Sequence, residues 1–275
     1  MHNLKWGNSM KLIHRWTRVT CIVSILLLAG MTLALAAAPQ PLKVGMELAY
    51  PPFEMTDTAG KPSGVSVDLA NELGKALGRP VVIQNMSFDG LIPALKTGKI
   101  DLIISSMTAT AERAKSIDFS EPYLKTGLCL LINKDAPVKT IADLDKTGKT
   151  VAVKKGTTGH LYATANLKAA RLLVLDKEAA AVLEVVQGKA DAFIYDQMST
   201  YQNWQRNQTA TRAILTPFQQ ESWAIGVRKG NDELKSVINA FLREYRGKGG
   251  FETLGDRYLK DMKGEFKRLG YQFFL

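Results

Sequence analysis

One phrase occurs twice in this chain, about ninety residues apart, and each copy ends in polar side chains that could bind a ligand. The first copy runs from Leu91 to Ser106 and the second from Val182 to Asp196. Each reads as an apolar helix, a Gly-Lys-x-Asp stop and a short apolar strand, because glycine suits a helix C-terminus and lysine suits its negative end. Open α/β sheets bind ligands at the carboxyl ends of their strands. The two copies therefore predict two similar lobes that offer polar groups to a cleft between them.

The first of these strands delivers hydroxyl groups, and the second delivers a carboxylate. Ser105, Ser106 and Thr108 follow the first strand, and Asp196 ends the second. Hydroxyls both donate and accept hydrogen bonds, whereas an ionised carboxylate only accepts them. Each residue also has a structural interpretation, since serine, threonine and aspartate are common helix N-caps and a helix is expected after each strand.

Three further residues suit a carboxylate ligand. Arg113 carries a guanidinium, which binds a carboxylate through two parallel hydrogen bonds. Its alternative role is a surface arginine on a short helix. Thr157 and Thr158 begin an expected helix, where exposed N–H groups and the helix dipole favour an anion. Their alternative role is a plain helix cap.

The composition argues against several classes of function. The net charge of +10 reflects 36 lysines and arginines against 26 acids. These basic residues are spread along the chain without an aromatic and basic stripe, so no nucleic-acid partner is expected. Cys129 and His160 are the only cysteine and histidine after residue 36. We therefore expect no metal cluster of cysteine and histidine and no cofactor, and a buried inert thiol at Cys129. No G-x-S-x-G motif or phosphate loop is present either.

The N-terminus has the pattern of a secretory signal peptide. Basic residues precede an apolar run over residues 21–38, and small residues follow toward Pro39. We place the cleavage after Ala36 and so predict a signal peptide over residues 1–36 and a periplasmic protein. An uncleaved membrane anchor is the alternative, because the apolar run reaches the lower limit for a spanning helix.

Strands and helices alternate through the rest of the chain, which predicts mainly parallel sheets. Extended stretches over 123–133 and 222–227 are expected to cross between the lobes. We therefore predict an α/β protein with two lobes, each a mainly parallel sheet flanked by helices, joined by two crossing strands. Lobe 1 is expected over 37–126 plus 222–275, and lobe 2 over 127–221.

Six stretches in order resemble the periplasmic amino-acid-binding proteins that feed ABC importers, known as family 3 solute-binding proteins. The resemblance covers nearly all of residues 41–262. It implies two α/β lobes that close on an amino acid about a hinge, and a membrane permease of an ABC importer as partner. We expect a monomer and no enzymatic activity. The matching stretches are Val44–Glu54, Gly64–Leu69, Phe88–Leu95, Asp101–Arg113, Ile117–Ser120 and Val151–Thr157.

The resemblance assigns roles to the polar residues. In the family, the arginine that matches Arg113 binds the ligand α-carboxylate, and the aspartate that matches Asp196 binds the α-ammonium. Thr157 also matches a ligand-binding position. The ligand would join the first lobe to the second and so stabilise the closed form.

The resemblance also addresses the ligand side chain. Tyr50 and Phe88 match an aromatic pair that sandwiches this side chain, with ordinary core packing as the alternative role. Glu47 matches a position where relatives place an acid near the distal end of the ligand. Together these residues predict a cationic ligand such as arginine, lysine, ornithine or histidine, although an acid there also occurs in binders of neutral amino acids.

Two other functions stay open at this point. Some relatives on this scaffold are cyclohexadienyl dehydratases, which act on prephenate or arogenate. They place a glutamate three residues after the position that matches Asp196, whereas this chain has Ser199 there. The second alternative is a soluble ligand-sensing module for a membrane receptor.

Overall fold

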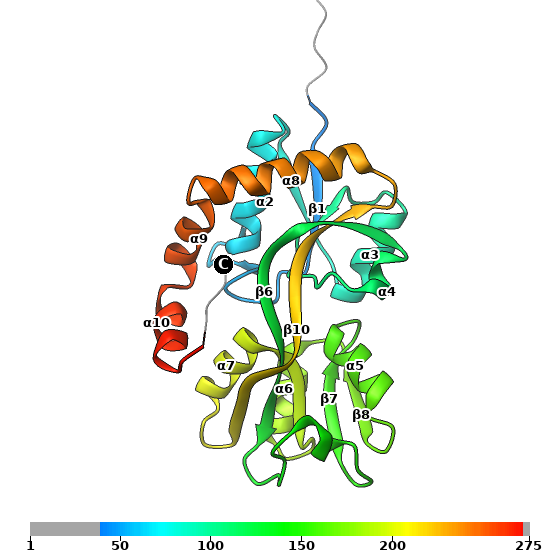
Figure 1. Ribbon diagram of the computed structural model, residues 1–275, viewed down its shortest axis with the longest axis vertical. Coiled ribbons are helices and arrows are strands. Elements are labelled where there is room, and N and C mark those ends of the chain that lie inside the picture. The colour runs from blue at the N-terminus through cyan, green and yellow to red at the C-terminus, as the bar shows by residue number, and fades with distance from the viewer. Residues whose placement is uncertain (1–38, 272–275) are drawn as a thin grey trace, which may run out of the picture. The chain divides into compact units, whose positions relative to one another are not determined.

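The computed structural model describes residues 39–271, so the predicted signal peptide over residues 1–36 lies outside the described residues. From Gln40 onward the chain forms one compact unit. Its main sheet, within the described residues, has eight strands in the order β4-β1-β5-β10-β6-β9-β7-β8. Figure 1 shows an upper lobe around β1 and a lower lobe around β7, with β6 and β10 running through both. The predicted two-lobed α/β class is confirmed.

The first lobe is built on strand β1, which pairs in parallel with β4 on one side and β5 on the other. Leu42, Val44 and Met46 of β1 are fully buried, as expected for a strand inside a parallel sheet. Helix α2 buries Leu69 and Leu73 in the same core. The elements of this part of the chain are β1 (Leu42–Met46), β2 (Met55–Thr56), β3 (Pro62–Ser63), α2 (Val65–Ala76), β4 (Val81–Asn85), the 3-10 helix η1 (Phe88–Gly90), α3 (Leu91–Lys96), β5 (Leu102–Ile103) and α4 (Ala111–Ala114).

The second lobe is built on strand β7, which pairs in parallel with β8 and β9. Val151 and Val153 of β7 pack against Ile194 of β9 in one buried cluster, and Phe193 of β9 belongs to another. The elements here are the 3-10 helix η2 (Ile141–Leu144), β7 (Thr150–Lys154), α5 (Thr158–Asn166), β8 (Arg171–Leu175), α6 (Glu178–Val186), β9 (Ala192–Asp196) and α7 (Gln197–Arg206).

Two long antiparallel strands, β6 (Ile117–Asn133) and β10 (Thr211–Arg228), connect the lobes. β10 reaches β5 of the first lobe, and β6 reaches β9 of the second. Both strands are longer than the predicted crossings over 123–133 and 222–227. The structure accommodates Pro217 within β10 at a register shift between Ile214 and Gln219. The predicted lobe boundaries fall where these strands pair, at Thr126 opposite Glu221.

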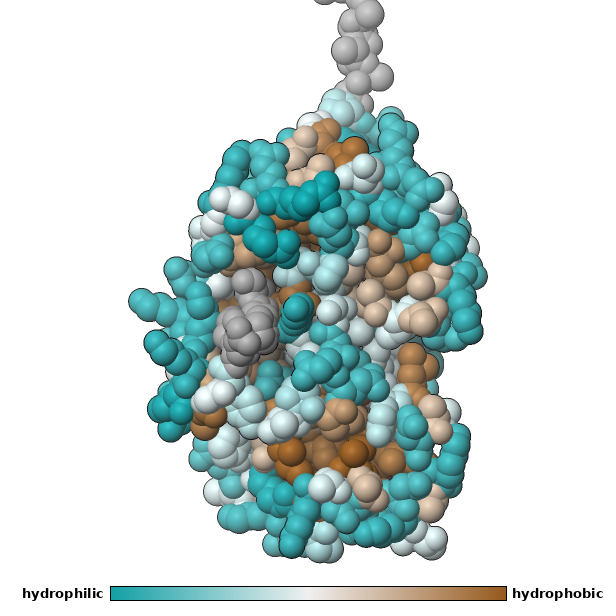
Figure 2. Space-filling view, viewed as in Figure 1, coloured by the Kyte–Doolittle hydropathy of each residue, from teal (hydrophilic) through white to brown (hydrophobic). Residues whose placement is uncertain are grey.

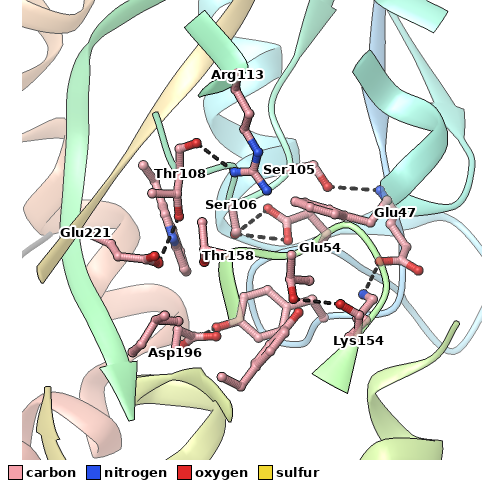
Figure 3. Close-up of a pocket in the computed structure, with 16 residues that line it drawn as sticks. Glu47, Glu54, Ser105, Ser106, Thr108, Arg113, Lys154, Thr158, Asp196 and Glu221 are labelled. Atoms are coloured by element: carbon pink, nitrogen blue, oxygen red, sulfur yellow. Dashed lines mark hydrogen bonds and ion pairs between the residues drawn. The ribbon is translucent and has the colours of Figure 1, made fainter. Parts of the chain in front are cut away.

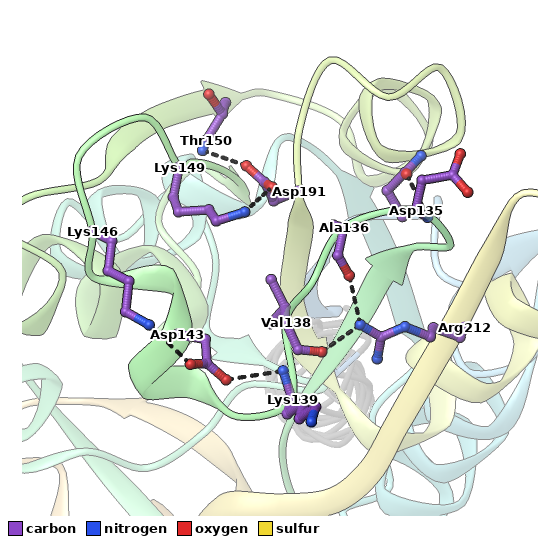
Figure 4. A network of polar contacts seen from close by, with 11 residues as sticks. Asp135, Ala136, Val138, Lys139, Asp143, Lys146, Lys149, Thr150, Asp191 and Arg212 are labelled. Carbon is purple, nitrogen blue, oxygen red and sulfur yellow. Dashed lines mark hydrogen bonds and ion pairs between the residues drawn. The ribbon is translucent and has the colours of Figure 1, made fainter.

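The repeated Gly-Lys-x-Asp phrase has the same structural role in both lobes. The carboxylate of Asp101 accepts a hydrogen bond from the N–H of Lys43, 3.0 Å away, at the start of β1. The carboxylate of Asp191 accepts one from the N–H of Thr150, 2.8 Å away, at the start of β7, and also pairs with Lys149 (Figure 4). Each aspartate therefore fixes the start of the neighbouring parallel strand. The strand that completes each copy of the repeat, β5 or β9, runs parallel to that neighbouring strand.

Three helices follow β10 within the described residues. They are α8 (Asp232–Gly247), α9 (Gly250–Tyr258) and α10 (Lys260–Arg268). Figure 1 shows α10 beside α7 of the second lobe, and the ring of Phe266 meets that of Tyr201 edge-on at 5.3 Å between centroids. The face drawn in Figure 2 is mainly hydrophilic, with a hydrophobic patch on the lower lobe. Within residues 39–271 no helix is both long and apolar enough to cross a membrane.

Candidate functional site

All ten residues proposed from the sequence as ligand-binding line one pocket between the lobes. They come from the loops after β1 and β5, from η1, α4 and the start of α5, and from the end of β9. The pocket has six further lining residues that the sequence analysis did not propose. The proposed residues are Glu47, Tyr50, Phe88, Ser105, Ser106, Thr108, Arg113, Thr157, Thr158 and Asp196, and the additional ones are Glu54, Leu128, Lys154, Tyr195, Glu221 and Trp223.

Arg113 is held in place by backbone carbonyls of both lobes. Its two terminal nitrogens donate to the carbonyl oxygens of Thr108, at 2.7 Å, and Gly156, at 3.0 Å. The residue is 6% exposed, and burial lowers its pKa to about 10, so it stays charged at neutral pH. Because a guanidinium has five N–H groups, it retains donors for a ligand. The geometry suits the binding of a carboxylate.

The two threonines lie beside this arginine at the start of α5. Thr157 is the N-cap of α5, where its hydroxyl donates to the carbonyl of Lys154, at 2.7 Å, and accepts from the N–H of His160. The structural interpretation of Thr157 is thus correct, and the residue also lines the pocket. Thr158 is buried in the first turn. The first N–H groups of α5 can supplement Arg113 in binding an anion.

Asp196 lies on the opposite side of the pocket from Glu47 and Lys154 (Figure 3). One carboxylate oxygen, Oδ1, accepts three hydrogen bonds, from the hydroxyl of Tyr50 at 2.7 Å and from the N–H groups of Met198 at 3.0 Å and Ser199 at 3.1 Å. Asp196 therefore caps α7 and still keeps its second oxygen for a ligand. Burial raises its pKa to about 7, which the hydrogen bond from Tyr50 opposes. An ammonium group placed against it would stabilise the ionised form.

Glu221 is a second buried acid near the proposed ammonium position. It comes from β10, and one of its carboxylate oxygens accepts a hydrogen bond from the hydroxyl of Thr108 at 3.0 Å. Burial raises the pKa of Glu221. No local sequence pattern indicated this residue, because an acid in a strand usually faces solvent.

The two serines of the first repeat serve other protein groups. Ser105 accepts a hydrogen bond from the N–H of Glu47 at 3.0 Å. Ser106, at a φ of 49°, donates to Glu54, 2.9 Å from Oε1, and Ser66 donates to the same carboxyl group. Burial raises the pKa of Glu54 to about 8. Glu54 is therefore mostly protonated and uncharged at neutral pH.

Glu47 has a protein partner that the sequence analysis did not anticipate. Its carboxylate forms an ion pair with the ammonium of Lys154, which ends β7 in the other lobe. Lys154 is 2% exposed. The rule that strand ends deliver polar groups to the cleft could have found Lys154, since it follows Val151-Ala-Val in the sequence.

The predicted aromatic pair is split between two environments. Tyr50 stacks on Phe53, with ring centroids 5.3 Å apart, and meets Trp223 edge-on. The ring of Phe88 lies 5.5 Å from the guanidinium carbon of Arg113 and 5.6 Å from the ammonium nitrogen of Lys154. Both rings line the pocket, but each already contacts other protein groups.

Contacts across the pocket show that the lobes are closed. Tyr50 reaches Asp196, Glu47 reaches Lys154, and Arg113 reaches the carbonyl of Gly156. In each pair the first residue belongs to the lobe around β1 and the second to the lobe around β7. Within the described residues no three histidine, cysteine, aspartate or glutamate side chains are arranged to hold a metal ion.

Known proteins share both the sequence and the fold. An L-arginine-binding protein of Pseudomonas aeruginosa is 32% identical over 246 residues, which are 86% of this chain and 95% of that protein. A binding component of an ABC transporter from Wolinella succinogenes, solved with lysine, is 38% identical with a TM-score of 0.73, covering 80% of this chain and 95% of that one. An ancestral amino-acid-binding protein, described as a precursor of cyclohexadienyl dehydratase, is 35% identical with a TM-score of 0.72, covering 79% and 95%.

Relatives at 27–30% identity are named as binding proteins for other amino acids, including L-cystine, histidine and glutamine. The shared feature of these names is amino-acid binding, and the side chain of the ligand differs. The family model for bacterial extracellular solute-binding proteins, family 3, matches residues 42–261. The chain therefore belongs to family 3 of the bacterial extracellular solute-binding proteins.

Proposed function

We propose that this protein captures a polar α-amino acid in the periplasm and delivers it to the permease of an ABC importer. The observation that carries the proposal is the placement of Arg113 and Asp196 on opposite lobes of one pocket. Both keep hydrogen-bonding capacity after their protein contacts are counted. A free amino acid carries a carboxylate and an ammonium, which match this pair in charge and in hydrogen bonding.

Capture works by closure of the two lobes. The carboxylate of the ligand binds Arg113 and the N–H groups at the start of α5, and the ammonium binds Asp196. Because these groups come from both lobes, the ligand has more contacts in the closed form than in the open form. A ligand shifts a conformational equilibrium only through such a difference. The permease then recognises the closed form.

The signal peptide over residues 1–36, the periplasmic location and the monomeric state are part of this proposal. So is the absence of catalysis. At Ser199, where dehydratases of this scaffold place a glutamate, the hydroxyl donates to Glu178 at 2.5 Å. Ser199 is therefore engaged away from the pocket lining and offers no acid to a substrate.

A more specific candidate is an amino acid with a cationic side chain. The names of the arginine-binding and lysine-bound relatives favour it, as does the acid at Glu47. The ion pair between Glu47 and Lys154 weakens that argument, because the charge of Glu47 is already balanced inside the protein.

The test is thermal unfolding of the purified protein, freed of ligand by unfolding and refolding, in the presence of single compounds. The panel holds the twenty amino acids, ornithine, citrulline and prephenate. A ligand at about 100 times its Kd should add about 2.7 kcal/mol, or roughly 5 to 10 °C for a protein of this size. The methyl ester of the best ligand is the matched control, since it lacks the carboxylate that Arg113 binds. A shift with prephenate alone would favour the enzyme, and equal shifts with ligand and ester would contradict the role of Arg113.

A further inference from the structure

The ion pair between Glu47 and Lys154 is part of the pocket wall. Figure 3 shows the two side chains meeting on the side of the pocket away from Asp196 and Glu221. Both line the pocket, and they come from different lobes, so the pair is complete only when the lobes are closed. Lys154 is almost completely buried. A buried lysine needs a partner for its charge, and Glu47 supplies that partner.

The aromatic ring in this region is also occupied by protein cations. Arg113 and Lys154 both lie within 6 Å of the centre of Phe88. An aromatic ring attracts a cation through the negative charge of its faces. Because two protein cations already lie at the ring, Phe88 would add little attraction for a cationic ligand side chain.

A second acid near Lys154, Glu54, adds little negative charge, and burial also raises the pKa of a third, Glu178. Glu54 is buried and accepts hydrogen bonds from Ser66 and Ser106. Its raised pKa of about 8 keeps it mostly uncharged at neutral pH. The side-chain end of the pocket, formed by Glu47, Glu54, Phe88 and Lys154, is therefore close to neutral overall while it carries a strong donor and a strong acceptor.

We propose that Lys154 takes the place of a ligand cation, so that the protein selects an amino acid whose side chain is neutral and bears both a donor and an acceptor. Carboxamide and ureido groups, as in glutamine and citrulline, have this chemistry. The inference deepens the proposed function and rests on it.

The atoms of the pair allow this recognition. The ammonium of Lys154 has three N–H groups, and one is used by Oε2 of Glu47. Another can donate to the carbonyl oxygen of the ligand side chain. The other carboxylate oxygen of Glu47 can accept from the ligand NH2 group. A cationic side chain has no acceptor for Lys154 and brings a like charge next to it, which is unfavourable in a buried site.

Arginine and citrulline give the sharpest comparison, because they have nearly the same shape and differ in charge. Isothermal titration calorimetry of the ligand-free protein should show citrulline or glutamine binding at least about tenfold more tightly than arginine or lysine. Lys154→Met removes the charge and keeps an apolar stem. It should reverse the order, with arginine gaining at least about tenfold over citrulline, because Glu47 is then unpaired.

Lys149→Met is the matched control. Lys149 precedes the same strand, β7, and also forms an ion pair, with Asp191, but it does not line the pocket. This variant loses the same charge and should keep the wild-type order of ligands. Thermal unfolding of each ligand-free variant checks its fold. If Lys154→Met does not fold, Glu47→Gln gives an independent test, since the unpaired Lys154 should then raise the affinity for glutamate relative to glutamine.

Tighter binding of arginine than citrulline by the wild type would overturn the inference, as would an unchanged ratio in Lys154→Met. Neither result would affect the proposed capture of amino acids. If the wild type bound none of the amino acids, the proposed function itself would fail.

Discussion

Replacing Asp196 by asparagine should stabilise the ligand-free protein while it removes tight ligand binding. The three hydrogen bonds from Tyr50, Met198 and Ser199 all end on the same oxygen, Oδ1. The carbonyl oxygen of asparagine can accept the same three bonds, and asparagine is as good an N-cap as aspartate. The substitution thus changes only the second oxygen, which becomes an NH2 group, and removes a buried charge. That NH2 group cannot accept a hydrogen bond from a ligand ammonium.

The magnitude follows from the pKa of Asp196, which burial raises from 3.8 to about 7. In the unfolded chain the carboxyl group loses its proton near pH 4, whereas in the folded protein it keeps the proton until near pH 7. Between these values the folded state binds more protons, so stability falls as the pH rises. The loss reaches about 4 kcal/mol above pH 7.

The asparagine variant does not suffer this loss. Its advantage over the wild type should grow from near zero below pH 4 to roughly 3 kcal/mol at pH 8, after about 0.3 to 1 kcal/mol is deducted for the lost attraction between the carboxylate and the N-terminus of α7. At 2 to 4 °C per kcal/mol, this is about 6 to 12 °C in the Tm of the ligand-free protein.

The assay is urea unfolding of ligand-free wild type and Asp196→Asn at pH 4 and pH 8, with calorimetric titration of the preferred amino acid at pH 8. Asp191→Asn is the control, because Asp191 stands at the other end of β9, fixes the start of β7 and does not line the pocket. This control should lose stability and keep ligand affinity. An Asp196→Asn variant that is less stable than the wild type at pH 8, or equally favoured at both pH values, would refute the reasoning. Unchanged affinity would refute the ammonium-binding role.

Two other predictions concern the binding of the ligand carboxylate by Arg113 and the packing of the second lobe. Arg113→Lys keeps the charge but loses the planar guanidinium that forms two parallel hydrogen bonds to a carboxylate, so ligand affinity should fall at least about hundredfold in calorimetric titration. A loss below tenfold would contradict the carboxylate-binding role of Arg113. A Cβ added at Gly159 would lie 2.5 Å from the carbonyl oxygen of Ile194, so Gly159→Ala should lower the free energy of unfolding in urea by about 1 to 3 kcal/mol. Gly264→Ala is its control, because a Cβ added there would meet no atom within 4 Å apart from its chain neighbours and the backbone of its own helix, and this helical site should gain about 0.5 to 1 kcal/mol. Similar effects of the two substitutions would show that the close contact is not the cause.

The location of the site could be predicted because short sequence patterns indicate where the strands begin and end. The two Gly-Lys-x-Asp phrases identified strands β5 and β9, and the pocket is lined by Ser105, Ser106 and Thr108 after β5 and by Asp196 at the end of β9. Such local signals also fixed the alternation of strands and helices. Their physical basis is that helix stops, apolar strands and caps each depend on a few neighbouring residues.

The charge balance of the pocket could not be predicted in the same way. Glu47 and Lys154 are 107 residues apart in sequence and meet only because the lobes close. The position of Lys154 at the end of a strand indicates that it lies near the cleft, but it does not indicate burial, because lysine usually faces solvent. The buried acids Glu54 and Glu221 are similar, because their pKa values depend on burial by distant segments. The length of β10 was missed because its pairing with β6 overrides the turn tendency of Pro217.

The paired strands β6 and β10 also affect how fast and how tightly this protein can respond to a ligand. A flexible tether would leave the two lobes free to diffuse, and each binding event would have to restrict that motion anew. Here two hydrogen-bonded strands cross together, so most relative translation and rotation of the lobes was already lost when the chain folded. Each lobe is held at a high effective concentration of the other. Opening and closing then require only bending of the segment where β6 and β10 cross between the lobes. The binding free energy of a small ligand is sufficient to favour the closed form.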